Sequence, residues 1–123
     1  MRSLSSIFDN AWQYLEPAAA HWRGHNKNTV WDAIEQRRAK LWHLQSGAVV
    51  TTIFTYPSGW KSAQAWLAGG DLDEIIEWAA GPGLAYARAN ECNEARMTGR
   101  RGFHRLMPGG EYKELGTVVV RDL

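Results

Sequence analysis

Two histidines one helical turn apart are the first pair of residues in this sequence that could do chemistry. His21 and His25 have the i, i+4 spacing with which two imidazoles on one helix face can bind zinc. Gly24 weakens any helix between them, and no third ligand stands nearby, since His43 and His104 are distant in the sequence. The pattern favours a solvated helix end, and we expect no metal site.

The single cysteine is a second candidate, because a thiolate is a strong nucleophile. Cys92 is followed by Glu94 and preceded by Glu91, and no cationic neighbour in the sequence favours its thiolate form. A lone cysteine cannot form a disulfide within the chain, so nothing indicates an oxidising compartment. The phosphate-loop and nucleophile-elbow motifs do not occur in the sequence. These observations argue against a thiolate nucleophile or a phosphate loop.

Arginines gather in one stretch of the C-terminal third, at Arg96, Arg100, Arg101 and Arg105. The Gly-Arg-Arg-Gly run that begins at residue 99 matches the Gly-x-x-Gly loop with which KH modules clamp a nucleic-acid backbone. That loop follows a helix, whereas the residues before this run read as a strand. The cluster therefore suits an acidic protein partner, an anion or pairing with the acidic helix expected after residue 71. Nucleic-acid contact stays open as an alternative.

Seven tryptophans in 123 residues are the other unusual feature. Trp60 and Trp66 share one face of an expected strand with Ser62 and Gln64 by period-two alternation. The opposite face of that strand is expected to carry the alternate residues: Lys61, Ala63, Ala65 and Leu67. Tryptophans fill the core of a short chain or form an exposed patch, and protein interfaces are enriched in Trp and Arg. We therefore keep Trp60 and Trp66 as candidate partner-binding residues.

The N-terminal part that precedes these residues reads as two helices. Ser6 followed by Asp9 resembles a capping box at the start of the first helix, and Pro17 is expected to interrupt or restart it. After a glycine-containing loop, Asn28 or Thr29 is expected to cap the second helix. These helices must cover one side of whatever sheet the remaining chain forms.

Three strands are expected next, over residues 40–46, 48–56 and 60–68, and together they form an antiparallel meander. A glycine pair ends the third strand, and Asp71 opens an acidic helix. The Gly-Pro-Gly run at 81–83 should break or kink that helix.

The remaining pattern predicts a resumed helix over 84–90, a strand over 95–98, a helical turn over 100–107 and a terminal strand over 112–120. The order of elements is then ααβββαβαβ. A meander followed by a strand–helix–strand crossover gives a mixed, mostly antiparallel sheet with helices on its faces, hence an α+β fold. The crossover should be right-handed and its two strands parallel.

Composition sets wider bounds. Apolar residues make up 45% and charged residues 22%, which is ordinary globular usage, and the formal net charge of +1 argues against a polycation that coats nucleic acid or membranes. No apolar run is long enough for a membrane span, and the N-terminus lacks the pattern of a signal peptide. We expect one soluble intracellular domain over 1–123, helical over 1–39 and sheet-based over 40–123.

This order of elements resembles the GNAT N-acetyltransferase fold. Over residues 40–123, three segments are more narrowly similar to small GNAT-like proteins of tailed bacteriophages: Leu67-Ala68-Gly69-Gly70-Asp71-Leu72-Asp73-Glu74, Gly99-Arg100-Arg101-Gly102-Phe103 with Arg105, and Val118-Val119-Val120-Arg121-Asp122-Leu123. The resemblance implies a location in a virion or in the host cytoplasm.

In the GNAT family, a loop with the pattern Arg/Gln-x-x-Gly-x-Gly/Ala and the helix start behind it bind the pyrophosphate of coenzyme A. The resemblance places the equivalent cofactor-binding residues at Leu67, Ala68, Gly69, Gly70 and Asp71. This segment lacks the Arg or Gln, and the carboxylates of Asp71, Asp73 and Glu74 would repel a pyrophosphate.

Family members also commonly use a strand-borne Glu as base and a Tyr on the last short helix as acid. The expected third strand carries no carboxylate, and the short helix carries no Tyr. Tyr112 is near in sequence and is the candidate catalytic acid if the protein is an acyltransferase.

Three hypotheses follow. The first is a catalytically degenerate GNAT-like phage protein without a cofactor, which contacts other virion proteins or itself as a virion or assembly component. The second is an acetyl-CoA-dependent N-acyltransferase. The third is a nucleic-acid-binding accessory protein that uses Arg100, Arg101 and Arg105. We expect no membrane partner.

Overall fold

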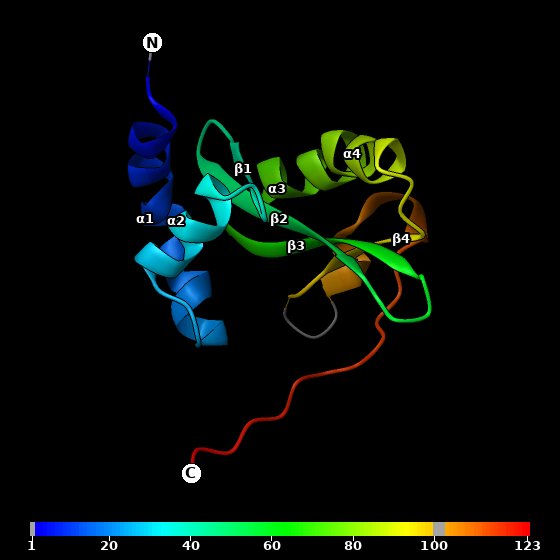
Figure 1. Cartoon of the computed structure of the whole chain (residues 1–123). Helices are drawn as coiled ribbons and strands as arrows, with labels where there is room; N and C mark the ends of the chain where they lie inside the picture. The colour runs from blue at the N-terminus through cyan, green and yellow to red at the C-terminus, as the bar shows by residue number, and fades with distance from the viewer. Residues whose placement is uncertain (1, 100–102) are drawn as a thin grey trace.

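The computed structural model describes residues 2–99 and 103–123 of the chain. Its centre is a sheet of four strands, in the spatial order β1 (Lys40–His43), β2 (Gly47–Thr55), β3 (Lys61–Gly70) and β4 (Glu94–Met97) (Figure 1). Strands β1, β2 and β3 pair antiparallel, and β3 pairs with β4 in parallel. Helices cover both faces of this mixed sheet, so the α+β fold class is confirmed.

Helix α1 (Leu4–Trp22) starts earlier than the sequence predicts. Its N-cap is Ser3, whose side chain accepts a hydrogen bond from the backbone N–H of Ser6. The capping box expected at Ser6 and Asp9 is therefore wrong: Ser6 lies inside the helix. Asp9 forms an ion pair with Lys27 instead, with 3.0 Å between the two charged groups, and so links α1 to the segment that follows.

The break expected at Pro17 is also wrong, because α1 continues through this residue. A proline inside a helix removes one backbone hydrogen bond and strains the preceding turn. Leu15 and Ala19, on either side of it, are both buried against the sheet. Their burial fixes the helix on both sides of the proline, and tertiary packing outweighs the local helix-breaking tendency.

The N-cap of helix α2 (Lys27–Glu35) lies two residues before the earlier of the two expected caps. This cap is Asn26, which forms a capping box with Thr29: the Thr29 backbone N–H donates to Asn26 Oδ1, and the Asn26 backbone N–H donates to Thr29 Oγ1. Asn28 is the second residue of the helix and not its cap. Thr29 takes part in the cap, but as the third helical residue.

A β-bulge in β3 changes which residues face the helices. Val50 pairs with Leu67 while Thr51 pairs with Ala65, so Trp66 has no partner on β2. Trp66 and Leu67 consequently both pack against the layer formed by α1 and α2. The expectation that Leu67 shares a face with Ala65 is wrong, because the extra residue shifts the alternation by one position.

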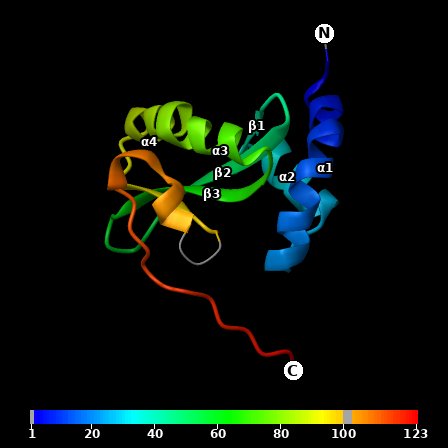
Figure 2. The ribbon, with the colours of Figure 1, turned by 180° about the vertical axis from the view of Figure 1, so that it is seen from behind.

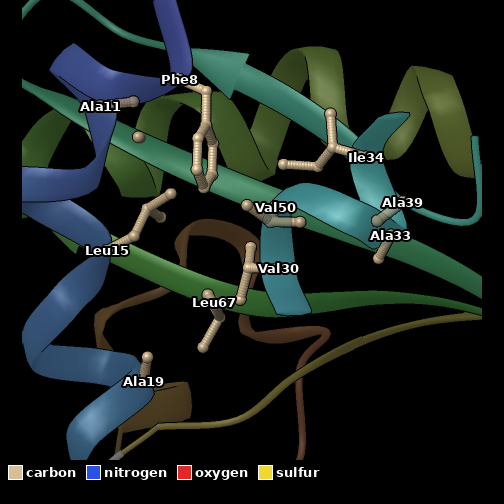
Figure 3. Close-up of a cluster of buried hydrophobic side chains, with 11 residues drawn as sticks. Phe8, Ala11, Leu15, Ala19, Val30, Ala33, Ile34, Ala39, Val50 and Leu67 are labelled. Carbon is tan, nitrogen blue, oxygen red and sulfur yellow. The ribbon is translucent and has the colours of Figure 1, made fainter. Parts of the chain in front are cut away.

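The first core lies between the sheet and helices α1 and α2 (Figure 3). Its large residues are each at most 5% exposed: Phe8, Leu15, Val30, Ile34, Val50 and Leu67. Small residues surround them and let the helices approach the sheet closely: Ala11, Ala19, Ala33, Ala39 and Ala48. Three tryptophans pack around this cluster: Trp12, Trp31 and Trp66.

The second core lies on the opposite face of the sheet, beneath helix α3 (Leu72–Trp78) and helix α4 (Leu84–Ala89) (Figure 2). Val49 belongs to this core although its neighbour Val50 belongs to the first, as the alternation of a strand requires. The N-cap of α3 is Asp71, as the sequence predicts. The expected break at 81–83 is a π-helical turn (Ala79–Gly83) that joins the two helices.

The C-terminal region differs most from expectation. The helical turn expected over 100–107 is a 3₁₀ segment at Phe103–Leu106, and a second 3₁₀ segment follows at Pro108–Gly110; residues 100–102 lie outside the described part. The terminal strand expected over 112–120 is wrong: after Tyr112 the chain leaves the body in extended form without pairing (Figures 1 and 2). A β-prone run becomes a strand only where a neighbouring strand edge accepts it. None of the helices in the described ranges is long and apolar enough to cross a membrane.

Candidate functional site

The end of β3, just before α3, is packed closely against two other parts of the chain. A Cβ atom added to Gly69 would overlap the backbone carbonyl of Tyr14 in α1. Gly70 has a φ of +104°, and a Cβ added there would overlap Ser46 and Gly47 of the β1–β2 turn. Both glycines are therefore required by close packing within the chain.

Carboxylates of the chain itself occupy the start of α3. Asp71 Oδ1 accepts a hydrogen bond of 3.0 Å from the backbone N–H of Glu74, which is an N-cap. The Glu74 carboxylate accepts hydrogen bonds of 3.0 and 3.1 Å from the backbone N–H of Ser46. The Asp71 backbone N–H donates to the carbonyl of Ser46, at 2.8 Å. The start of α3 and the β1–β2 turn thus form hydrogen bonds with each other's polar groups.

This arrangement does not fit the pyrophosphate of coenzyme A. Asp71, Asp73 and Glu74 place three carboxylates in the first turn of the helix, where a pyrophosphate would bring further negative charge. No Lys or Arg lies among the cofactor-binding residues expected from the sequence, which are Leu67, Ala68, Gly69, Gly70 and Asp71. Leu67 is buried in the first core, and Ala68 packs beside the second.

A small cavity lies between β3, β4 and the α3–α4 layer. Its volume is about 20 Å³, which holds about one water molecule. Gly83 lies close against the Trp78 ring on one wall of the cavity: a Cβ added to Gly83 would lie 3.1 Å from Cη2 of Trp78. Tyr112 lines the cavity beside Met97, and burial raises the pKa of its phenol. Among the described residues, the lining includes no carboxylate or imidazole that could act as a base beside Tyr112.

A polar cluster that sequence reasoning missed lies near the start of β3 and β4. The Glu94 carboxylate accepts hydrogen bonds from Arg96 Nε at 2.7 Å, Ser62 Oγ at 2.6 Å and Trp60 Nε1 at 2.8 Å. The hydrogen bond from Arg96 is the main cause that lowers the pKa of Glu94 to about 2, with Ser62 and Trp60 contributing and partial burial opposing. Only the parallel register, in which Ser62 pairs with Glu94, brings these residues together.

The candidate arginines do different things in the structure. Arg96 is engaged by Glu94, and its guanidinium lies 5.6 Å from the centre of the Tyr56 ring. Arg105 lies on the first 3₁₀ segment and is exposed. Arg100 and Arg101 lie outside the described residues. The expected cluster therefore consists, in the described part of the chain, of one paired and one exposed arginine.

The two candidate tryptophans lie in different environments. Trp60 is 47% exposed and is hydrogen-bonded to Glu94 at the far end of the sheet. Trp66 is half-buried against the first core, and its ring meets that of His25 edge-on at a centroid distance of 4.7 Å. His25 lies beyond the end of α1, so it does not share a helix face with His21. Across residues 2–99 and 103–123, no group of three or more His, Cys, Asp or Glu side chains is placed to hold a metal ion.

No family model matches the sequence, and no curated protein matches it either. Among solved structures, the chain is similar to a ribosomal-protein-alanine N-acetyltransferase from Brucella melitensis biovar Abortus 2308. The TM-score is 0.55 at 14% sequence identity, and the match covers 98% of this chain and 95% of that chain. This likeness shows that the fold is GNAT-like, as the resemblance in the sequence implies.

Proposed function

We propose that this protein uses the GNAT-like fold without its coenzyme and acts through protein contacts, as a virion or assembly component. The observation that carries the proposal is the start of α3, where Asp71 caps the helix and Glu74 binds the backbone of Ser46. The groups that would receive a pyrophosphate are engaged within the chain, and the charge at this position is negative. The virion setting is inferred from the resemblance of three sequence segments to tailed-phage proteins.

The small cavity supports the same proposal. The cavity beneath the α3–α4 layer has a volume of about 20 Å³, which holds about one water molecule and is too small to enclose an acyl chain. Opening it would move the Trp78 ring, which is 6% exposed and belongs to the second core. Such a movement would break core packing and not merely rotate a surface side chain.

Exposed apolar side chains support the part of the proposal that concerns protein contacts. Phe54 and Trp60 are each about half exposed near the β2–β3 turn. The C-terminal tail, residues 113–123, adds further exposed apolar residues: Leu115, Val118, Val119, Val120 and Leu123. Large apolar residues that gather on a surface are typical of protein interaction sites.

Calorimetric titration of the full chain with acetyl-CoA tests the proposal. We expect no binding at ligand concentrations up to about 1 mM, whereas a functional coenzyme site would give a Kd near the micromolar range. A matched titration of Asp73→Asn, which removes one repulsive charge without touching the N-cap, controls for the local electrostatics. Micromolar binding by the unaltered chain would overturn the proposal.

An acetyl-CoA-dependent N-acyltransferase is the second candidate. The observation in its favour is the position of Tyr112, which lines the small cavity beneath the α3–α4 layer and has a pKa raised by burial. The similar solved structure is by its title an N-acetyltransferase. If this candidate is right, acetyl transfer to an amine occurs and Tyr112→Phe lowers its rate at least about tenfold. The nucleic-acid alternative stays a prediction, because Arg100 and Arg101 lie outside the described residues.

A further inference from the structure

The C-terminal tail has the composition of a strand but no sheet to join in its own chain. Thr117 and the three valines after it form a β-branched run, and Val119 is 92% exposed. Apolar residues point to both sides of the extended chain, since Leu115 and Val119 alternate with Val118 and Val120. A strand that is apolar on both sides is suited to burial on both faces and not to an open edge.

Among the described residues, the ion pairs of the tail lie at its two ends. His104 Nδ1 lies 3.7 Å from a carboxylate oxygen of Glu114, and Asp122 forms an exposed ion pair with Arg23 after α1. The pair of Asp122 with Arg23 is exposed, and an exposed ion pair contributes little stability. Between them, within the described residues, the tail backbone makes no hydrogen bond to other backbone groups. Its donors and acceptors are free to pair with another strand.

The sheet offers a matching edge. Strand β4 is the last in the sheet, and in the part of the chain that the structure describes nothing pairs with its outer side. β4 has four residues, the same length as the run from Thr117 to Val120. Apolar groups flank this edge on one side, where Met97 and Phe103 pack, and the half-exposed Trp60 lies on the other.

The tail cannot place this run on β4 of its own chain. Tyr112 packs beside Met97 at the C-terminal end of β4, so an antiparallel return would put residues 113–116 opposite the strand. Residues 117–120 begin five positions later, about 17 Å along an extended chain at 3.3 Å per residue. That distance exceeds the roughly 13 Å length of a four-residue strand. The three valines would therefore lie beyond the first residue of β4 and could not pair with that strand.

We propose that Thr117–Val120 adds as an antiparallel strand to β4 of a second copy of this chain, so that two copies exchange their tails. In this register Val120 lies opposite Glu94 and Thr117 lies opposite Met97 of the other copy. In a closed two-fold dimer, the exchange pairs the tail of each copy with the unpaired edge of β4 in the other copy. It rests on the proposed function, because it names the partner of a protein that acts through contacts.

A disulfide test separates exchange from pairing within one chain. In the proposed register Asp122 lies opposite Cys92 of the other copy. On oxidation, the Asp122→Cys variant therefore forms a disulfide-linked dimer, and a reductant cleaves this link. Pairing of the tail with its own β4 would bring residue 117 or 118 near Cys92 and would link Thr117→Cys to Cys92 within a monomer. That result would overturn the proposal. Asp122→Cys in a Cys92→Ala background is the control, and a dimer that persists there would show tail-to-tail contact and overturn it too.

Light scattering of the full chain gives the second test. We expect a concentration-dependent dimer. Val118→Lys with Val120→Asp sets like charges opposite Arg96 and Glu94 of the other copy and lowers the association constant at least about 100-fold without unfolding the monomer. The matched control is Lys113→Ala, outside the exchanged run. A chain that stays monomeric at all concentrations overturns the exchange alone, since the acetyl-CoA titration does not depend on it. Coenzyme binding by a clean dimer would overturn the proposed function instead.

Discussion

The Glu94 carboxylate is the most strongly stabilised titratable group in the described part of the chain. Ser62 of β3, Arg96 of β4 and Trp60, just before β3, donate to it, and Ser62 is fully buried. These bonds favour the charged form and hold the pKa at about 2, below the model-compound value of 4.5. A carboxyl group so stabilised is a weak base, and its role is to join the starts of β3 and β4.

This pKa predicts how stability depends on pH. Because the pKa of Glu94 is lower in the folded state, its contribution is complete above pH 4.5 and is lost as the pH falls towards 2. Glu94→Gln should lower the free energy of unfolding by about 1–2 kcal/mol at pH 7 and should flatten its decline in acid. Urea unfolding at several pH values measures both effects. Glu77→Gln, at an exposed position, is the control, and an equal loss there would contradict the prediction.

Gly69 gives a second prediction at the residue scale, because packing and ligand binding require it for different reasons. Gly69→Ala places a methyl group against the Tyr14 carbonyl, so we expect a loss of about 2 kcal/mol or more in the free energy of unfolding. Gly81→Ala enters open space and should leave stability nearly unchanged. Denaturant titration compares the two. Unaltered stability in Gly69→Ala would indicate that the glycine is kept for a ligand.

At the element scale, local sequence signals predict most of the order of helices and strands. They fail where tertiary packing determines the structure. The strands and the cap at Asp71 follow from β-branched runs, glycine turns and N-cap chemistry. The continuous helix through Pro17 could not be predicted, because the burial that maintains it is tertiary. The bulge at Trp66 and the unpaired tail depend equally on neighbouring elements, which a pattern along one segment does not contain.

The candidate site shows the same limit. The carboxylates at 71, 73 and 74 can be read directly, and they alone predict a poor pyrophosphate site. The hydrogen bond from Ser46 to Glu74 joins residues far apart in the chain, and so does the pairing of Ser62 with Glu94. The first depends on how α3 packs against the β1–β2 turn, and the second on the parallel register of β3 and β4, neither of which the sequence specifies.

The start of α2 gives a prediction that distinguishes the observed cap from the expected one. Asn26→Ala removes the acceptor for the Thr29 backbone N–H and should lower the free energy of unfolding by about 1 kcal/mol. Asn28→Ala, at the position expected from the sequence, should have little effect, because Asn28 is a helical residue. Thermal unfolding of both variants decides between them, and a larger loss in Asn28→Ala would refute the observed cap.

At the scale of the whole molecule, one sheet carries two cores. Val49 and Val50 are adjacent in β2 and are both fully buried, yet they belong to opposite sides of the sheet. A change in one core therefore reaches the other through a shared strand and not through a separate interface. The extended tail lies outside both cores, so exchange of the tail would leave the folding of the body intact.

This shared strand predicts that both cores unfold in one transition. Leu15→Ala creates a cavity in the first core and should lower the free energy of unfolding by about 2–5 kcal/mol. Because β2 serves both cores, the fluorine NMR signals of fluorotryptophan at Trp31 and at Trp78 should disappear at the same urea concentration. Met107→Ala, in the second core, should shift both signals together as well. Loss of the Trp31 signal before that of Trp78 would mean that the α1–α2 layer unfolds independently of the sheet.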